Sequence, residues 1–331
     1  MDVMCRPVAC GVAAIAVSMA AAAGVSAHEA PSSARAIPGT ACPNFPDDSW
    51  WSADIRKLPV HARSQQWMSH MSPGRLLHPD FGPSYGEIPV PYGIPITIVD
   101  NTHPKVKVTF QYVSQSDKVR YPLGDDTRVE GGQYNSGDRH TIVVNKDTCR
   151  LYETWATRRQ GNRWSAGSGA TWKLDSNDLR PRGWTSADAA GLPILPGLLR
   201  YDEVVRGKVD HAIRFTTDVT DKTFLWPARH HAGSVNNRNY PPMGARFRLK
   251  ASYTISSSLR PDTQAVLRGM KRYGLVLADN GSPWYFQGTS DRRWPGNFID
   301  ELKRIPASAF EAVDTSSLMI SSDSMQVRAL P

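Results

Sequence analysis

Short runs in which apolar and polar residues alternate constrain the fold of this chain more than any other feature. The clearest run is KVKVTF at residues 105–110, which has the alternation of a half-buried β-strand. Similar runs occupy residues 140–144, 151–155, 211–215, 247–253 and 275–278. Glycine and proline, 25 of each, separate these runs and mark turns. The sequence therefore predicts a mainly β protein, a jelly-roll-like β-sandwich with long loops.

Helical patterns are few and short. The best begins at Pro261, a residue suited to the first helical position, and ends before Gly274. It places Val266, Met270 and Tyr273 on one face. Two further helices are expected at residues 198–205 and 298–304. These helices are expected to decorate the sandwich.

The N-terminus has the pattern of a secretory leader. Arg6 precedes an almost uncharged run from Val8 to Val25, and the small residues up to Ala27 suit a signal peptidase. A membrane anchor is the alternative, but the run is at the short limit for crossing a bilayer and lacks a basic flank. We therefore expect cleavage after Ala27, a secreted or periplasmic protein, and no stable membrane insertion.

Four cysteines are present, and two of them, Cys5 and Cys10, lie in the expected leader. Cys42 and Cys149 remain in the mature chain. An exported chain with two cysteines usually pairs them, so we expect a Cys42–Cys149 disulfide. The alternative is two unrelated buried thiols.

The composition of the chain predicts its domain organisation and the kind of partner that it binds. Residues 28–42 are expected to form a flexible lead-in, residues 43–314 a single β-rich domain and residues 315–331 a polar tail. The net charge of +8 favours acidic partners, such as acidic polysaccharides, cell-wall polymers or anionic membrane surfaces. Nucleic acid is not expected as a partner outside the cell, and the oligomeric state is left open.

Several segments resemble a family of exported bacterial proteins to which no activity is attached. Among them are LHPDFG at 77–82, GDRH at 137–140, GWTSADAAGLP at 183–193, RYDEV at 200–204, PPMG at 241–244 and ADNGS at 278–282. The likeness spans residues 43–313 and departs at Trp50-Trp51, where the family has Trp followed by Asn. The resemblance implies an exported, single-domain, β-rich protein and carries over no catalytic residues.

Carboxylates beside histidine or aromatic residues are the candidates for acid and base chemistry, because burial and neighbours must move a pKa toward the working pH. Four places qualify, namely Asp138 with His140, Glu153 between Tyr152 and Trp155, Asp202 with Glu203, and Asp279 after an apolar strand. Structural roles are the alternatives. Asp202 and Glu203 would only cap a helix, Asp279 would form an Asx turn, and Asp138 would pair with Arg139.

Histidines offer a second source of a general base, and His140, His211 and His230 all fall near predicted strands. No H-E-x-x-H, C-x-x-C pair or EF-hand loop occurs, so no metal site is predicted. The absence of a P-loop and of a dinucleotide fingerprint predicts no cofactor. Ser168 lacks the outer glycines of a G-x-S-x-G elbow, which argues against a serine hydrolase.

Aromatic and cationic residues are the candidates for substrate binding. The chain has ten tryptophans and eleven tyrosines, and flat rings stack on sugar faces, although most such rings fill a core. The candidates are Trp155, Trp172, Trp184 and Tyr201. In the run RFRLK at 246–250, Arg246 and Arg248 would line one face of a strand, to bind a polyanion or to protect a sheet edge.

These features together predict a secreted carbohydrate-active enzyme that cleaves a polysaccharide. In a glycoside hydrolase, two of Glu153, Asp202, Glu203 and Asp279 would be acid and base or nucleophile. In a lyase acting on an acidic polysaccharide, His140, His211 or His230 would work with Tyr201, while Arg246 or Arg248 neutralises the substrate carboxylate. The alternative is a non-catalytic glycan-binding or envelope-associated β-sandwich protein.

Overall fold

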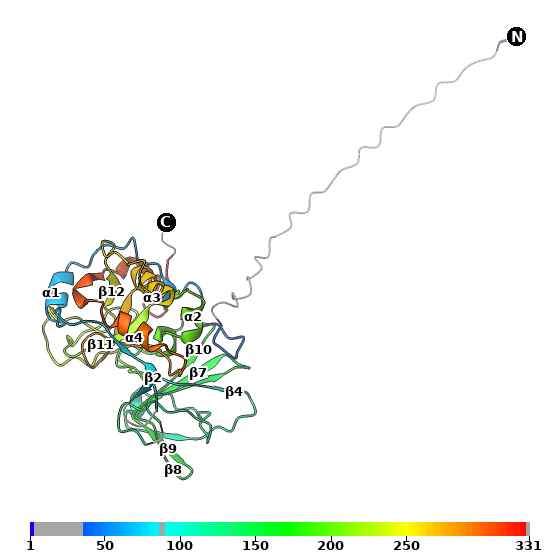
Figure 1. Ribbon diagram of the computed structural model, residues 1–331. Helices are drawn as coiled ribbons and strands as arrows, with labels where there is room; N and C mark the ends of the chain where they lie inside the picture. Colours follow the sequence, from blue (N-terminus) through cyan, green and yellow to red (C-terminus); the bar gives the residue numbers. More distant parts are fainter. Residues whose placement is uncertain (3–35, 86–89, 133, 329–331) are drawn as a thin grey trace. The chain divides into compact units, whose positions relative to one another are not determined.

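The computed structural model describes residues 1–2, 36–85, 90–132 and 134–328 (Figure 1). The chain divides into two units, residues 1–30 and residues 31–331, and the fold described below is that of the larger unit. Apart from Met1 and Asp2, the predicted leader and its cleavage position after Ala27 lie outside the described residues.

The described part of the chain is mainly β, as predicted. The largest sheet has the order β1-β14-β11-β13-β12-β15, formed by His78–Asp80, Tyr285–Gln287, Ile213–Thr217, Leu275–Asn280, Arg246–Leu249 and Phe310–Val313. A four-stranded sheet has the order β10-β7-β6-β4, formed by Ser168–Lys173, Arg150–Trp155, Thr141–Asn145 and Ile96–Val99. A three-stranded sheet joins β5 (Val108–Phe110), β9 (Arg163–Ala166) and β8 (Arg158–Gln160). β2 (Gly82–Tyr85) pairs with β3 (Val90–Tyr92).

The direction in which the strands pair does not establish the jelly roll that the sequence predicted. A jelly roll consists of antiparallel strands. Here β1 pairs with β14, β11 with β13, β4 with β6 and β5 with β9 in parallel. Both larger sheets are therefore mixed.

The helices gather around the six-stranded sheet (Figure 1). α3 spans Pro261–Arg272, close to the prediction, and its Val266 and Met270 are fully buried. α2 (Tyr201–Val205) and α4 (Gly296–Leu302) fall within or near the other two predicted helices. α1 (Ser64–Ser69) was not predicted.

Strand β12 is buried on both faces. Arg246 and Arg248 are only 1% and 9% exposed. Arg246 donates to the carbonyl of Tyr273 and lies over the Trp50 ring, and Arg248 Nη1 donates to the Ile55 carbonyl at 2.8 Å. β12 lies between β13 and β15, so it is not an edge strand. The predicted open row of cations does not form at these two residues. The chain near residues 50–58 covers this face of the strand, and its carbonyls accept hydrogen bonds from the two guanidinium groups.

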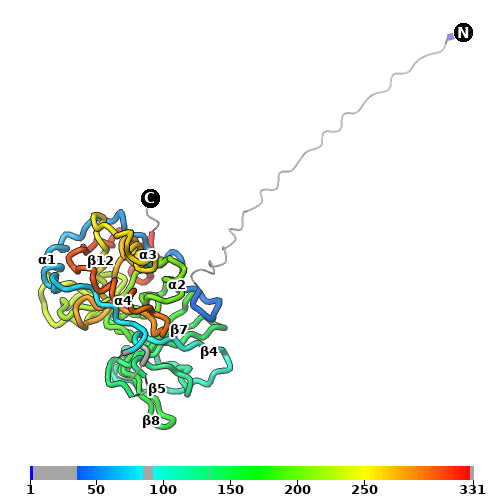
Figure 2. The backbone as a smooth tube through the Cα atoms, in the orientation of Figure 1, coloured from blue at the N-terminus to red at the C-terminus, as the bar shows by residue number. Residues whose placement is uncertain are grey.

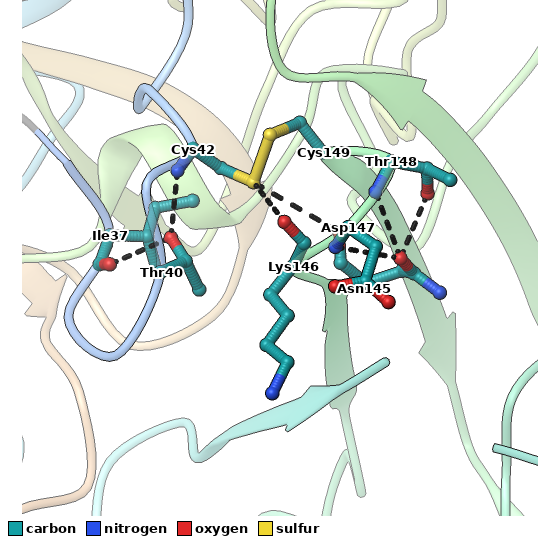
Figure 3. Close-up of a disulfide and its surroundings, with 8 residues drawn as sticks. All are labelled: Ile37, Thr40, Cys42, Asn145, Lys146, Asp147, Thr148 and Cys149. Atoms are coloured by element: carbon teal, nitrogen blue, oxygen red, sulfur yellow. Dashed lines mark hydrogen bonds between the residues drawn. A yellow bond between two sulfur atoms is a disulfide. The ribbon is translucent and has the colours of Figure 1, made fainter. Parts of the chain in front are cut away.

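The Cys42–Cys149 disulfide is present, as predicted, with the two Cα atoms 5.2 Å apart (Figure 3). Cys149 follows the turn between β6 and β7, where the Asn145 side chain accepts the backbone N–H groups of Asp147 and Thr148. The bridge spans 107 positions and ties the segment before the first helix to the four-stranded sheet.

Residues 48–50 run beside residues 325–327, close to the C-terminus that is marked in Figure 2. The Trp50 N–H donates to the Met325 carbonyl at 2.8 Å, and Ser49 forms a bridge with Gln326. Leu318 and Met325 are buried. Part of the segment assigned from sequence to a polar tail therefore packs against the core.

Candidate functional site

A cavity of about 270 Å³ opens where the ends of β7, β10 and β13 meet four segments that lie outside the strands. We call it the acid pocket. Its lining includes Tyr112, Asp138, Trp155, Asp188, His230 and Asp279. The structure thus brings together four residues selected from sequence, namely Asp138, Trp155, His230 and Asp279. They come from segments up to about 140 positions apart, and only the tertiary fold places them at one cavity.

Asp279 lies near the end of β13, a strand whose preceding residues are fully buried. Its side chain is 26% exposed, and its Oδ2 lies 3.8 Å from Nη2 of Arg214. Burial and the neighbouring charge of Asp188 raise the pKa of Asp279 to about 7, although Arg214 opposes the rise. A carboxyl group with this pKa at a cavity wall is able to donate a proton near neutral pH.

Asp188 and Arg214 form a buried pair at the cavity, and of the two only Asp188 is in its lining. Arg214 projects from β11 and donates to both carboxylate oxygens of Asp188, at 2.8 and 3.1 Å. Their side chains are 0% and 3% exposed. Burial opposes the charge of Arg214, but Asp188, and to a smaller extent Asp279 and Glu130, raise its pKa, so it stays charged. Arg214 binds both oxygens of Asp188 and favours their charge, but burial has the larger effect and raises the pKa of Asp188 above its usual value.

His140 lies deeper than the cavity and does not line it. Its Nδ1 contacts Oε2 of Glu130 at 2.7 Å, and its Nε2 has no hydrogen-bond partner among the described residues. Burial acts against the charged imidazole, but the charge and hydrogen bond of Glu130 outweigh it and raise the pKa of His140 to about 9. A histidine protonated at neutral pH is no general base, so His140 contributes a buried positive charge.

His230 differs from His140 in its protonation state. Its Nδ1 lies 2.9 Å from the carbonyl oxygen of Ala189. Since a carbonyl only accepts, Nδ1 carries the proton and the lone pair is on Nε2. Burial lowers the pKa of His230 below its usual value, and the adjacent His231 adds to this. His230 is therefore a neutral acceptor at the cavity.

Two aromatic rings form a rim beside these polar groups. The centroids of the Tyr112 and Trp155 rings are 6.3 Å apart, and Tyr112 is 44% exposed. The Trp155 indole N–H donates to Oδ1 of Asp138, an exposed residue, at 3.3 Å. Gly167 is required here, because a Cβ at that position would lie 2.1 Å from the Trp155 ring. Rings next to carboxylates provide the flat surface on which a sugar stacks.

Glu153, a leading candidate from sequence, has a structural position. It is fully buried, and its carboxylate accepts the backbone N–H groups of Ile194 and Leu195 at 2.9–3.0 Å. These bonds hold the start of the 3₁₀ turn Leu195–Gly197. Burial raises the pKa of Glu153 to about 7, but the side chain does not line the acid pocket.

The candidates on and near α2 form a separate ionic cluster. Glu203 is 1% exposed and lies 3.0 Å from His211 Nε2 and 3.0 Å from Nη2 of Arg200. Asp202 pairs with Arg206 at 2.9 Å. None of these residues lines the acid pocket.

The remaining aromatic candidates also lie outside the acid pocket. The Tyr201 ring packs edge-on against Trp294 and beneath Arg293. Trp172 is 4% exposed, and the guanidinium of Arg180 lies over the rings of both Trp172 and Trp184.

Asp188, Arg214 and Glu130 were not identified from sequence. Arg214 could have been suspected, because a cation inside the apolar run HAIRF needs a buried partner. Nothing local indicates Asp188 as that partner, or Glu130 as the partner of His140, since they reach the cluster from positions 26 and 84 residues before Arg214.

Among the described residues, no group of three or more His, Cys, Asp or Glu side chains is placed to hold a metal ion. The same part of the chain contains no helix with the length and hydropathy of a membrane span. No family model matches the sequence, and comparison with curated proteins and with solved structures finds no significant match. The function is therefore argued from the site geometry.

Proposed function

We propose that the acid pocket is the catalytic site of an enzyme that hydrolyses a polysaccharide. The observation that carries the proposal is Asp279, whose pKa is raised to about 7 at the wall of a cavity rimmed by Trp155 and Tyr112. The Cys42–Cys149 disulfide supports the proposed export, because disulfides persist in oxidising compartments.

In this mechanism Asp279 is the general acid. Its proton passes to the glycosidic oxygen as the bond from that oxygen to the anomeric carbon breaks. Asp138, on the exposed side of the cavity, is the second carboxylate that stabilises or activates attack at the anomeric carbon. Water adds to that carbon and loses one proton, either to the carboxylate of Asp279 or, where Asp138 is the base, through Asp138 to solvent, from which Asp279 takes up a proton again. His230 accepts a sugar hydroxyl through Nε2, while Trp155 and Tyr112 stack on the sugar ring.

The cavity favours hydrolysis over β-elimination. A lyase must neutralise the carboxylate next to the carbon that loses its proton. No Arg or Lys is among the described residues that line the acid pocket. The nearby Arg214 is occupied by Asp188, and Arg246 and Arg248 are buried on β12. A neutral sugar unit therefore fits this cavity better than a uronate.

The test is a screen of the purified protein against neutral and acidic polysaccharides, with release of reducing ends as the measurement. Asp279→Asn is expected to lower the rate by about 100-fold or more, because the general acid is lost. Asp202→Asn removes a carboxylate outside the cavity and should leave the rate unchanged. Activity should fall as the pH rises through about 7, where Asp279 loses its proton. Intact polysaccharides throughout, or an active Asp279→Asn variant, would refute the proposal.

The rim formed by the exposed Tyr112 and the half-buried Trp155 also supports a second candidate, a non-catalytic glycan-binding protein. A binder needs the rings but not the proton of Asp279. In that case a polysaccharide would bind without cleavage, Trp155→Ala would abolish binding, and Asp279→Asn would retain it.

A further inference from the structure

A second surface, which shares no lining residue with the acid pocket, carries a cluster of positive side chains beside the three-stranded sheet. A groove of about 530 Å³ is lined by Lys105, Lys107, Arg120 and Arg163. We call these four residues the basic face. The groove lining contains no Asp or Glu among the described residues.

Strand geometry places these cations on one side of the sheet. Val106 bridges Tyr121 in an antiparallel pair, so Lys107 lies opposite Arg120. Val108 pairs with Trp164 in parallel, so these residues face one way and their neighbours Lys107 and Arg163 face the other. Trp164 is 6% exposed, whereas the four cations are exposed.

The charges of the basic face are not neutralised by the protein. No carboxylate lies within ion-pair distance of any of the four side chains in the part of the chain that the structure describes. The acids of the adjoining groove, Asp125 and Asp126, are paired with Arg159 and His103. Lys107 and Arg120 lie opposite each other beside the isolated Val106–Tyr121 bridge. Like charges placed in this way repel each other and lower stability, so the stability of the fold does not explain why both are present.

Protection of a sheet edge is the structural alternative. β5 is an edge strand, and lysines on edges hinder pairing with another chain. That role needs side chains on the edge strand only. Arg163 lies on β9, the central strand, and Arg120 on a separate segment. The groove therefore holds more charge than edge protection requires.

We infer that the basic face is a binding site for an acidic polysaccharide, separate from the acid pocket. Four cations along a groove, with the polar side chains of Thr109 and Asn162, suit a chain of carboxylated or sulfated sugars. A single-stranded nucleic acid would need exposed rings for base stacking, and Trp164 is covered. A membrane surface would need exposed apolar side chains beside the cations, and the groove has only the half-buried Val106.

The experiment measures binding of the full chain to a polyuronate, a sulfated polysaccharide and a neutral polysaccharide of similar length by calorimetry. Both acidic polymers should bind, and binding should weaken strongly in about 0.5 M NaCl because salt screens exposed charges. Lys107→Gln with Arg163→Gln is expected to raise Kd about tenfold. The matched control, Lys208→Gln with Arg268→Gln, removes two exposed cations from another surface and should leave Kd within about twofold.

Three outcomes would overturn the inference: equal binding by both double variants and the wild type, equal loss in both double variants, or tighter binding of anionic vesicles or an oligonucleotide. A binding preference for either acidic polymer identifies the charged group and supports the site. The result is distinguishable from that for the acid pocket, because Asp279→Asn should retain binding at the basic face. Conversely, Lys107→Gln with Arg163→Gln should retain cleavage of short oligosaccharides.

Discussion

Replacement of Glu130 by Gln should destabilise this protein near pH 6 and have a much smaller effect above about pH 9. Glu130 holds the buried His140 in its charged form through a 2.7 Å contact. The His140 side chain is 4% exposed, so little water is present to replace that partner. In the Glu130→Gln variant the amide can still accept the Nδ1 proton of a neutral imidazole. The variant therefore removes the charge interaction and leaves the packing nearly unchanged.

The expected magnitude follows from the pKa of His140. The pKa is about 9 in the folded chain and about 6.5 in an unfolded one, and this difference corresponds to about 3 kcal/mol. Because the folded pKa is the higher one, this stabilisation is fully present below about pH 6.5 and is lost as the pH rises through about 9. The lowered pKa of Glu130 and the raised pKa of His140 result from the same interaction, so only one of the two contributes to this free energy.

The assay is denaturant unfolding of wild type and Glu130→Gln at about pH 6, 7.5 and 9.5. The variant should be less stable by about 3 kcal/mol at the lowest pH and by less than about 1 kcal/mol at the highest. Comparison of the two proteins at each pH cancels the other titrating groups. A loss of stability that stays constant over this range would show that His140 does not carry the charge, and the reasoning would be refuted.

Three further substitutions test other parts of the structure. Arg214→Met leaves the fully buried carboxylate of Asp188 without its partner and should lower the free energy of unfolding by about 3–5 kcal/mol. Adding Asp188→Asn to this variant should restore part of the lost stability. An equal loss of stability in the double variant would contradict the pairing. Glu153→Ala removes the acceptor of two buried backbone N–H groups and should cost about 2–4 kcal/mol in denaturant unfolding, so a change below about 1 kcal/mol would exclude this role. Cys42→Ser with Cys149→Ser should cost about 2–5 kcal/mol, and reductant should lower the melting temperature of the wild type but not of the variant.

The sequence predicted most of the secondary structure because the signals are local. Alternation at residues 140–144 and 151–155 corresponds to β6 and β7, and the proline start and glycine end delimit α3. The run at residues 105–110 gives only the short β5, because Val106 forms an isolated bridge with Tyr121 before the strand begins. Sheet order was not predictable, since parallel pairs such as β11 with β13 join segments about 60 positions apart.

The candidate site was predicted in part. Asp279, Asp138, His230 and Trp155 were chosen for their residue type, and they do line one cavity. Glu153 was chosen for its place in an aromatic strand, but that strand turns its carboxylate toward two buried N–H groups. The alternation that suggested an open row of cations at residues 246–250 was misleading, because the chain near residues 50–58 covers the second face of β12, and the sequence of the strand does not show this cover.

The sequence by itself determined the β-rich character, the pairing of Cys42 with Cys149 and the placement of the main helix, because each depends on neighbours in the chain or on a simple count. Only the tertiary structure decided which carboxylates carry a fixed charge and which face a cavity. The pKa of Asp279 depends on Asp188 and Arg214, and burial and charge act through space rather than along the sequence.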